Sequence, residues 1–225
     1  VFVTVGRRLA WGGTTLARLE RSGAADPVLE PTHRDDPAAI LFTSGSTGPP
    51  KGVLYTHGMF HAQVNALRAM YDFEPGEIDL ACFPLFALFD IAFGMTSVFP
   101  DMDVTKPARC QPEKIVRAIQ ECGATTAFGS PAIWLRVLPH CREQGIKLSG
   151  LRRLLMAGAP VPPDLIQDAH AVLSLEADVH TPYGATESLP VATVAGREVV
   201  PGLLEPLRNG AGTCVGRPSP AIQIQ

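Results

Sequence analysis

The chain has 225 residues, enough for one large or two small domains, and its 46% hydrophobic and 18% charged residues are typical of a globular protein with a buried core. The net charge of −3 and the absence of a basic run argue against nucleic acid as a main partner, because a phosphate backbone needs clustered lysine and arginine. The five cysteines are widely spaced without a C-x-x-C pair, which favours reduced thiols and a cytoplasmic location over a disulfide framework or a zinc site.

The first 37 residues are expected to form a strand, a short amphipathic segment and a polar connecting loop. Val1–Val5 is strand-like, Thr14–Arg21 has an amphipathic pattern, and residues 22–37 carry three prolines. The start of the chain lacks the layout of a signal peptide. Because the chain begins at valine and ends at Gln225 in a strand-like run, we expect it to be a piece of a longer protein.

From residue 38 onward, apolar strand patterns alternate with helical patterns. Strands are expected at 38–42, 53–55, 78–83, 125–128, 153–156 and 177–180, and helices at 57–71, 86–99, 111–122, 131–144 and 163–174. Thr56 and Ser130 are the expected N-caps of two of these helices, and Gly123 is an expected helix stop. The alternation predicts an α/β fold with a mostly parallel sheet and helices on both faces. From about Val191 the pattern becomes strand-like again, which predicts the start of a second, smaller sheet.

The longest apolar stretch, Leu80–Phe99, approaches the length of a bilayer span. Pro84, Asp90 and Gly94 interrupt it, and an aspartate at the centre is costly in hydrocarbon. We therefore expect a buried strand followed by a core helix, and no transmembrane segment. Within that helix, Asp90 is expected to be a buried acid with satisfied hydrogen bonds rather than a catalyst.

A loop rich in glycine and hydroxyl residues follows the strand at 38–42. It reads Thr43, Ser44, Gly45, Ser46, Thr47, Gly48, Pro49, Pro50, Lys51 and Gly52. Glycines let backbone N–H groups converge on an anion, hydroxyls add donors, and the lysine supplies positive charge, so the loop is suited to polyphosphate. It does not fit the Walker pattern, because proline precedes the lysine, and the dinucleotide pattern is absent. A flexible linker has a similar composition, but the flanking apolar strands favour a nucleotide-phosphate loop.

This loop resembles the signature of the acyl-adenylating enzyme superfamily, which includes acyl-CoA synthetases, luciferases and the adenylation domains of peptide synthetases. The family pattern T-S-G-[ST]-T-G-x-P-K-G is matched without a gap. Three further family elements follow in the expected order: Ala157-Gly158-Ala159-Pro160, Tyr183-Gly184-Ala185-Thr186-Glu187 and Val215-Gly216-Arg217-Pro218. Four elements in order are far more specific than one, and the resemblance extends from about residue 38 to the end of the chain.

The resemblance implies that the chain is the central part of the large N-terminal domain of an adenylate-forming enzyme. Residues 38–190 would be the ATP-binding α/β core, and residues 191–225 the start of a β-rich subdomain. The small C-terminal domain of the family is absent from the chain. The family's ribose-binding acid and its C-terminal lysine are therefore expected beyond Gln225.

The resemblance also implies ATP-dependent activation of a carboxylate with Mg²⁺. The loop from Thr43 to Lys51 would hold the β- and γ-phosphates, Thr186 would contact the α-phosphate, and Glu187 would bind Mg²⁺. Tyr183 would stack on adenine. The remaining nucleotide-binding residues would be Gly184, Gly158, Ala159 and Pro160. Lys51, Thr186 and Glu187 are the expected catalytic residues.

The substrate class is also inferred from resemblance. Many acyl-CoA synthetases have a histidine after the P-L-F element, where this chain has Ala87, which weakens the case for CoA as the acceptor. Residues 83–90 and 126–131 are most similar to the β-lactone synthetases of bacterial long-chain olefin biosynthesis. They imply a long-chain 2-alkyl-3-hydroxy acid whose own hydroxyl captures the adenylate, and association with other enzymes of the same lipid pathway. A long-chain acyl-CoA ligase and a non-catalytic nucleotide-binding module stay open as alternatives.

An apolar acyl pocket is expected around Phe128, Gly129, Trp134 and Ala157, although packing in the core would bury the same residues. Two histidines lie four residues apart at the start of the helix predicted at 57–71. They do not form the metalloprotease motif, because the residue after the first of them is Gly58 and not glutamate.

Overall fold

The computed structural model describes residues 2–7, 12–23, 30–43, 48–220 and 222–224. The N-terminal part contains β1 (Val3–Thr4), β2 (Thr14–Thr15) and α1 (Leu16–Ser22), with β1 and β2 paired in parallel. Thr15 caps the helix, because its hydroxyl accepts a hydrogen bond from the backbone N–H of Arg18 at 3.2 Å. The strand expected at the start of the chain is present as the two-residue β1, and the segment expected at 14–21 forms β2 and α1, which has no buried residue.

A seven-stranded sheet forms the centre of the molecule. Its strand order is β11-β10-β9-β8-β7-β5-β6, and the strands from β6 to β9 are parallel, whereas β10 is antiparallel to both of its neighbours. The strands are β5 (Ile78–Ala81), β6 (Thr96–Val98), β7 (Thr126–Gly129), β8 (Arg153–Met156), β9 (Asp178–Ala185), β10 (Ser188–Ala195) and β11 (Arg217–Pro218). The predicted α/β class with a mostly parallel sheet is confirmed.

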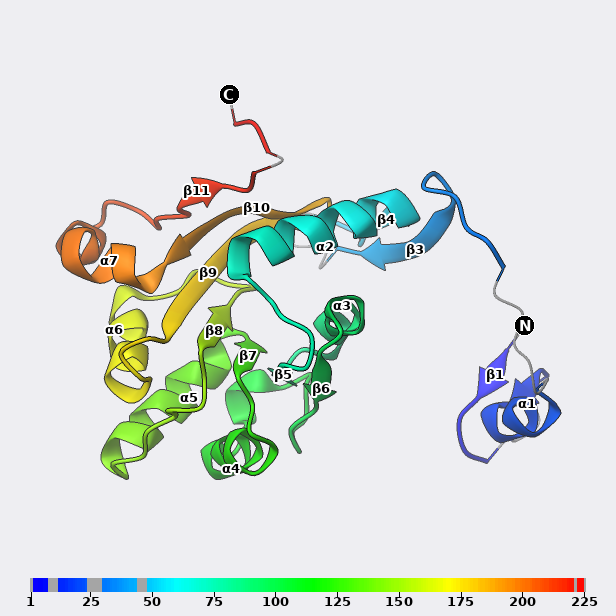
Figure 1. Ribbon diagram of the computed structural model, residues 1–225, viewed down its shortest axis with the longest axis horizontal. Coiled ribbons are helices and arrows are strands. Elements are labelled where there is room, and N and C mark those ends of the chain that lie inside the picture. Colours follow the sequence, from blue (N-terminus) through cyan, green and yellow to red (C-terminus); the bar gives the residue numbers. More distant parts are fainter. Residues whose placement is uncertain (1, 8–11, 24–29, 44–47, 221, 225) are drawn as a thin grey trace.

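Helices cover both faces of this sheet (Figure 1). On one face α4, α5 and α6 pack side by side, and on the other α2 contacts α3. Two short helices, α7 and α8, lie between β10 and β11 in the chain. The helices are α2 (His57–Tyr71), α3 (Ala87–Phe93), α4 (Pro112–Cys122), α5 (Pro131–Glu143), α6 (Pro163–Val172), α7 (Gly196–Gly202) and α8 (Leu204–Arg208), with 3-10 turns at Pro84–Phe86 and Pro107–Arg109.

The hydrophobic core is divided by the sheet because neighbouring residues of a strand face opposite sides. Leu154 of β8 belongs to the larger cluster, which includes side chains of α4, α5 and α6. Leu155 belongs to the smaller cluster, which includes Tyr71 of α2 and Phe93 of α3. The smaller core leaves room for the apolar pocket described below.

We expect Leu154→Ala to lower the free energy of unfolding by about 2–5 kcal/mol, because it leaves a cavity in the middle of the central strands. Leu154 is 0% exposed, whereas Leu175 is 100% exposed, so Leu175→Ala is a matched control that should change stability by less than about 0.5 kcal/mol. Urea unfolding followed by circular dichroism measures both. Equal stability of the two variants would contradict this description of the core.

The prediction of one helix from 86 to 99 is wrong for the second half of that segment. The helix α3 ends at Phe93, because Gly94 adopts a left-handed backbone with φ +75°. The chain then forms β6, where Thr96 pairs with Ile78 of β5. No helix in the described part of the chain is long and apolar enough to cross a bilayer.

The prediction of a second sheet at the C-terminal end is also wrong for the described residues. The strand-like region begins at Ser188, earlier than predicted, and forms β10, which crosses the boundary predicted at residue 190. Both β10 and β11 pair into the main sheet. Gly216 permits this arrangement, since a Cβ on it would lie 1.9 Å from the carbonyl oxygen of Thr193 in β10.

The first two core strands form a separate antiparallel hairpin instead of joining the parallel sheet. They are β3 (Pro37–Phe42) and β4 (Gly52–Thr56), and Phe42 is paired with Gly52 at the end of the hairpin. The hydroxyl-rich loop connects the two strands directly, and such a short connection allows an antiparallel pair but no parallel crossover.

Candidate functional site

The hydroxyl-rich loop is closed at its base by two hydrogen bonds. The backbone N–H of Thr43 donates to the carbonyl oxygen of Lys51 at 3.0 Å, and the backbone N–H of Lys51 donates to Thr43 Oγ1 at 3.1 Å. The Lys51 side chain is exposed and makes no ion pair with any described residue. Four predicted phosphate-binding residues lie outside the described residues: Ser44, Gly45, Ser46 and Thr47.

The turn between β9 and β10 carries Thr186 and Glu187. Glycine is required at position 184, because a Cβ there would lie 2.7 Å from the carbonyl oxygen of Ser188 in the facing strand. Thr186 is half-buried, whereas Glu187 is exposed and has no ion pair among the described residues. The Glu187 carboxylate is therefore available to a ligand.

A buried tyrosine links the hairpin to this turn. Tyr55 of β4 is 2% exposed, and its hydroxyl donates to the carbonyl oxygen of Thr186. Gln63 of α2 strengthens the link, since its side-chain amide donates to the carbonyl oxygen of Leu189 at 2.8 Å. Tyr55 thus ties β4, the strand that follows the Lys51 loop, to the turn that carries Thr186. Sequence reasoning missed Tyr55, because a tyrosine in an apolar strand has the pattern of an ordinary core residue.

A large cavity lies at the carboxyl ends of β8 and β9, the usual place for a ligand in an open parallel sheet. Its volume is about 640 Å³. It is lined by five of the residues predicted to bind the nucleotide, namely Gly158, Ala159, Pro160, Tyr183 and Gly184. Val215, from the fourth family element, lines the same cavity. Three segments that are far apart in the sequence therefore meet at one cavity.

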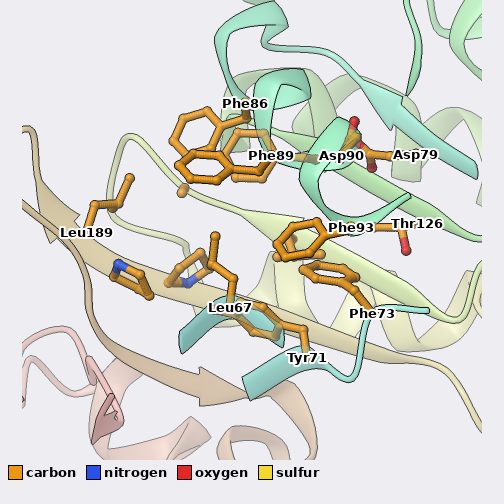
Figure 2. A pocket seen from close by; sticks show the side chains of 15 residues that line it. Leu67, Tyr71, Phe73, Asp79, Phe86, Phe89, Asp90, Phe93, Thr126 and Leu189 are labelled. Carbon is orange, nitrogen blue, oxygen red and sulfur yellow. The ribbon is translucent and has the colours of Figure 1, made fainter. Parts of the chain in front are cut away.

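A second, narrow pocket lies between α2, α3 and the sheet, and Figure 2 shows the side chains around it. Its volume is about 60 Å³, and most of its lining is aromatic or aliphatic. The lining residues are Leu67, Tyr71, Phe73, Asp79, Phe86, Phe89, Asp90, Phe93, Thr126, Phe128, Leu155, Ala157, Pro182, Leu189 and Pro190. Pro182 lines both this pocket and the large cavity, so the two adjoin there.

Two of the four residues predicted to line the apolar pocket do so. Phe128 and Ala157 line it, and the Phe128 ring lies 4.3 Å from that of Phe86 between centroids. Trp134 instead lies in the larger core, fully buried beneath the opposite face of the sheet. Gly129 faces that same side, where a Cβ would lie 3.0 Å from Trp134 Nε1. The strand alternation that puts Phe128 in the pocket turns Gly129 away from it.

Two buried carboxyl groups meet at one end of the apolar pocket. Asp79 of β5 and Asp90 of α3 are close enough for each to shift the pKa of the other, and the hydroxyl of Ser97 donates to Asp90 Oδ2 at 2.6 Å. Burial, and then the neighbouring Asp90, raise the pKa of Asp79 well above its ordinary value. Burial also raises the pKa of Asp90, and its hydrogen bonds oppose that rise. Asp90 is a buried, hydrogen-bonded acid, as expected.

We expect Tyr55→Phe to lower carboxylate-dependent exchange of pyrophosphate into ATP by about tenfold, because the lost hydroxyl no longer holds the Thr186 carbonyl and the turn is free to shift. The change keeps the buried ring, so stability should fall by only about 1 kcal/mol. Exchange rates and thermal unfolding measured on the same preparation separate the two effects. Unchanged exchange in this variant would show that the link has no part in positioning the turn.

The chain matches a protein family and several known proteins. A family model described as AMP-binding enzyme matches residues 5–225. The chain is 54% identical over 219 residues to the olefin beta-lactone synthetase of Stenotrophomonas maltophilia (strain K279a), covering 95% of this chain and 38% of that protein. It is 52% identical over 216 residues to the olefin beta-lactone synthetase of Xanthomonas campestris pv. campestris, covering 96% of this chain and 38% of that protein.

Among solved structures, the chain is similar to the inhibitor-bound N-terminal domain of FACL13 from Mycobacterium tuberculosis. The TM-score is 0.70 at 25% sequence identity, and the match covers 92% of this chain and 50% of that chain. The chain spans 38% of the length of the two β-lactone synthetases that it matches. The expected resemblance is confirmed, for a chain that corresponds to a part of those proteins.

Proposed function

The chain belongs to the AMP-binding enzyme family, and on this basis we propose that the protein containing it activates a long-chain 2-alkyl-3-hydroxy acid with ATP and closes the product to a β-lactone. The observation that carries the proposal is that the two cavities share a lining residue, Pro182 of β9. A nucleotide-sized cavity and an apolar pocket share a wall there, immediately before Tyr183 in the chain. An adenylate-forming enzyme needs this arrangement, because the acyl group must reach the α-phosphate.

The large cavity fits ATP in size and lining. A volume of about 640 Å³ lies within the range of small-molecule sites. Gly158 has φ +89°, and nothing lies within 4 Å of the place where its Cβ would be, so the backbone is open to a flat base. In this proposal, adenine packs against Tyr183 and this backbone. The loop at Lys51 receives the β- and γ-phosphates, while Thr186 contacts the α-phosphate.

Glu187 is the residue proposed to hold Mg²⁺. No group of three or more potential metal ligands occurs in the described part of the chain, which suits an ion that typically takes one or two carboxylates together with substrate phosphates. The position of Glu187 supports this role, because its side chain is exposed beside the half-buried Thr186 and has no ion pair within the described ranges. When bound, Mg²⁺ neutralises phosphate charge as the carboxylate approaches.

The first step joins two anions, so its barrier is mainly one of charge and alignment. The substrate carboxylate attacks the α-phosphorus of ATP, the bond to the bridging oxygen breaks, and pyrophosphate leaves. The positive charge of Lys51 and the donors of its loop stabilise the departing phosphates. Tyr55 holds the Thr186 turn, which keeps the α-phosphate in line with the leaving group.

The second step uses a nucleophile that the substrate carries. The 3-hydroxyl oxygen attacks the activated carbonyl carbon, the bond from that carbon to the AMP oxygen breaks, and the hydroxyl proton passes to solvent. Proximity compensates for ring strain, since well-oriented intramolecular reactions reach effective molarities on the order of 10⁵ M or more. The buried Ala87 at the start of α3, where many acyl-CoA synthetases have histidine, supports an acceptor other than CoA.

The test is to incubate the full-length protein with ATP, Mg²⁺ and a long-chain 2-alkyl-3-hydroxy acid, with and without CoA. The proposal expects equal amounts of β-lactone and AMP in the absence of CoA. The matched 2-alkyl acid without the 3-hydroxyl should support pyrophosphate exchange but give no lactone. A thioester that forms only when CoA is added would instead assign the protein as a long-chain acyl-CoA ligase, and nucleotide binding without AMP formation as a non-catalytic module.

A further inference from the structure

The apolar pocket ends in polar side chains on the side away from the large cavity. Figure 2 shows Asp79, Asp90 and Thr126 at the end opposite Leu189. Asp79 and Thr126 are paired in register on the neighbouring strands β5 and β7. Thr126 lies two residues before Phe128, which puts it roughly 7 Å further from the carboxyl ends of the strands. The polar end is therefore remote from the junction at Pro182.

These polar groups are deeply buried and incompletely satisfied. Asp79, Thr126 and Asp90 are 4%, 2% and 6% exposed. Among the described residues, neither Thr126 Oγ1 nor Asp79 Oδ1 has a hydrogen-bond partner. No lysine, arginine or histidine of the described ranges forms an ion pair with either carboxyl group. A hydrogen-bonding ligand would stabilise these groups, because a buried polar atom without a hydrogen bond costs free energy.

The charge state of the acid pair favours a neutral ligand. Two carboxylates in contact cannot both ionise easily, and burial raises the pKa of both Asp79 and Asp90, so the pair resists losing both of its protons. Asp90 also accepts a hydrogen bond from Ser97. A buried acid pair of this kind disfavours an anionic ligand, while Thr126 can both donate and accept. A hydroxyl group matches this set, since it too donates and accepts.

The open space in the pocket is about 60 Å³ and holds only a few water molecules. A long acyl chain enters only where the lining side chains move apart, and a methyl-ended chain that displaced the waters at this end would leave the polar atoms unpaired. A chain that stops short of the end, with water left in place, avoids that cost.

We propose that Asp79, Asp90 and Thr126 form a polar end wall of the acyl pocket, which limits the length of a methyl-ended acyl chain and accepts a hydroxyl group at the same position. This inference rests on the proposed function, because it assumes that the apolar pocket holds the acyl chain. It makes Asp79 and Thr126 specificity-determining residues that act on a part of the substrate far from the reacting carboxylate.

The experiment compares two series of 3-hydroxy acids of increasing length as substrates of the full-length protein, one ending in CH₃ and one in CH₂OH. Acid-dependent exchange of pyrophosphate into ATP gives kcat/KM for each. Short hydroxyl-ended acids should react more slowly than their methyl-ended counterparts. At the one length that reaches the wall, the order should reverse, with an advantage of roughly tenfold for the hydroxyl.

Variants then test whether the polar end wall causes the reversed order of kcat/KM. Thr126→Val keeps the shape and removes the hydroxyl, and should reduce the tenfold advantage to about twofold. Asp79→Asn preserves a neutral hydrogen-bonding group and should keep most of the advantage. Thr96→Val, the same substitution on the exposed start of β6 outside the pocket, should leave both series unchanged.

The possible failures can be told apart. If no acid supports exchange in the wild-type protein, the proposed function is wrong, and the proposal of a polar end wall is refuted together with it. If methyl-ended acids support exchange but no length shows the reversal, the polar end holds only water and the wall is refuted. The wall is likewise refuted if Thr126→Val shows the full reversal.

Discussion

Glu187→Gln is expected to reduce carboxylate-dependent exchange of pyrophosphate into ATP by roughly 10²–10³-fold, the cost of losing one preorganised charge in an active site. The amide keeps the size of the side chain but has no negative charge for Mg²⁺. Stability should not change, because Glu187 is exposed and unpaired among the described residues. Exchange assays on the full-length protein, with thermal unfolding as the check on folding, measure both quantities.

Glu121→Gln is the matched control, since Glu121 is exposed on α4, on the far side of the sheet from the apolar pocket. It should retain normal exchange. Raising the Mg²⁺ concentration should restore part of the lost activity in Glu187→Gln and none in an inactive, misfolded protein. A folded Glu187→Gln enzyme with exchange close to wild type would remove Glu187 from the metal site.

Lys51→Met is expected to lower the same exchange by roughly 10²-fold, because a positive charge opposite the departing phosphates is lost. Methionine retains the length and the apolar stem of the side chain. The backbone N–H of Lys51 still donates to Thr43 Oγ1, so the base of the loop should stay closed. Lys106→Met is the control, because Lys106 is an exposed lysine that forms an ion pair with Asp103 three residues away.

The kinetic pattern of Lys51→Met distinguishes binding from catalysis. We expect both a higher KM for ATP and a lower kcat, since the β- and γ-phosphates gain charge as the α-phosphorus bond breaks. A variant that loses less than about threefold in kcat/KM would contradict a role for Lys51 at the phosphates.

Local signals in the sequence predicted much of the fold. Helix α2 spans His57–Tyr71 as expected, with Thr56 as its N-cap, because the cap and the helical pattern agree. The strand β8 also has its predicted bounds, since a short apolar run in a buried parallel strand has few alternatives. The gathering of Gly158 and Tyr183 at one cavity followed from the family motifs and from the topology of a parallel sheet.

Two errors came from local signals that were given too little weight. Gly94 is a helix stop that ended α3 early, and the β-branched residues after it pair with β5 as a strand. The short turn at Thr186 and Glu187 joins β9 and β10 as a hairpin, which brought β10 into the main sheet.

Side-chain contacts across the fold, by contrast, were invisible in the sequence. The hydrogen bond from Tyr55 to Thr186 joins residues 131 positions apart. The contact between Asp79 and Asp90 depends on the angle at which α3 crosses β5. Each residue alone has the pattern of an ordinary core position, and only the fold shows that they share a site.

The most direct test of the central claim is acid-dependent pyrophosphate exchange, combined with identification of the nucleotide product. The full-length protein is supplied with ATP, Mg²⁺ and a long-chain 2-alkyl-3-hydroxy acid, and radiolabelled pyrophosphate is followed into ATP. We expect exchange that requires the acid, with AMP as the nucleotide released on turnover. Exchange at the acid-free level with every long-chain acid, or release of ADP in place of AMP, would contradict the central claim.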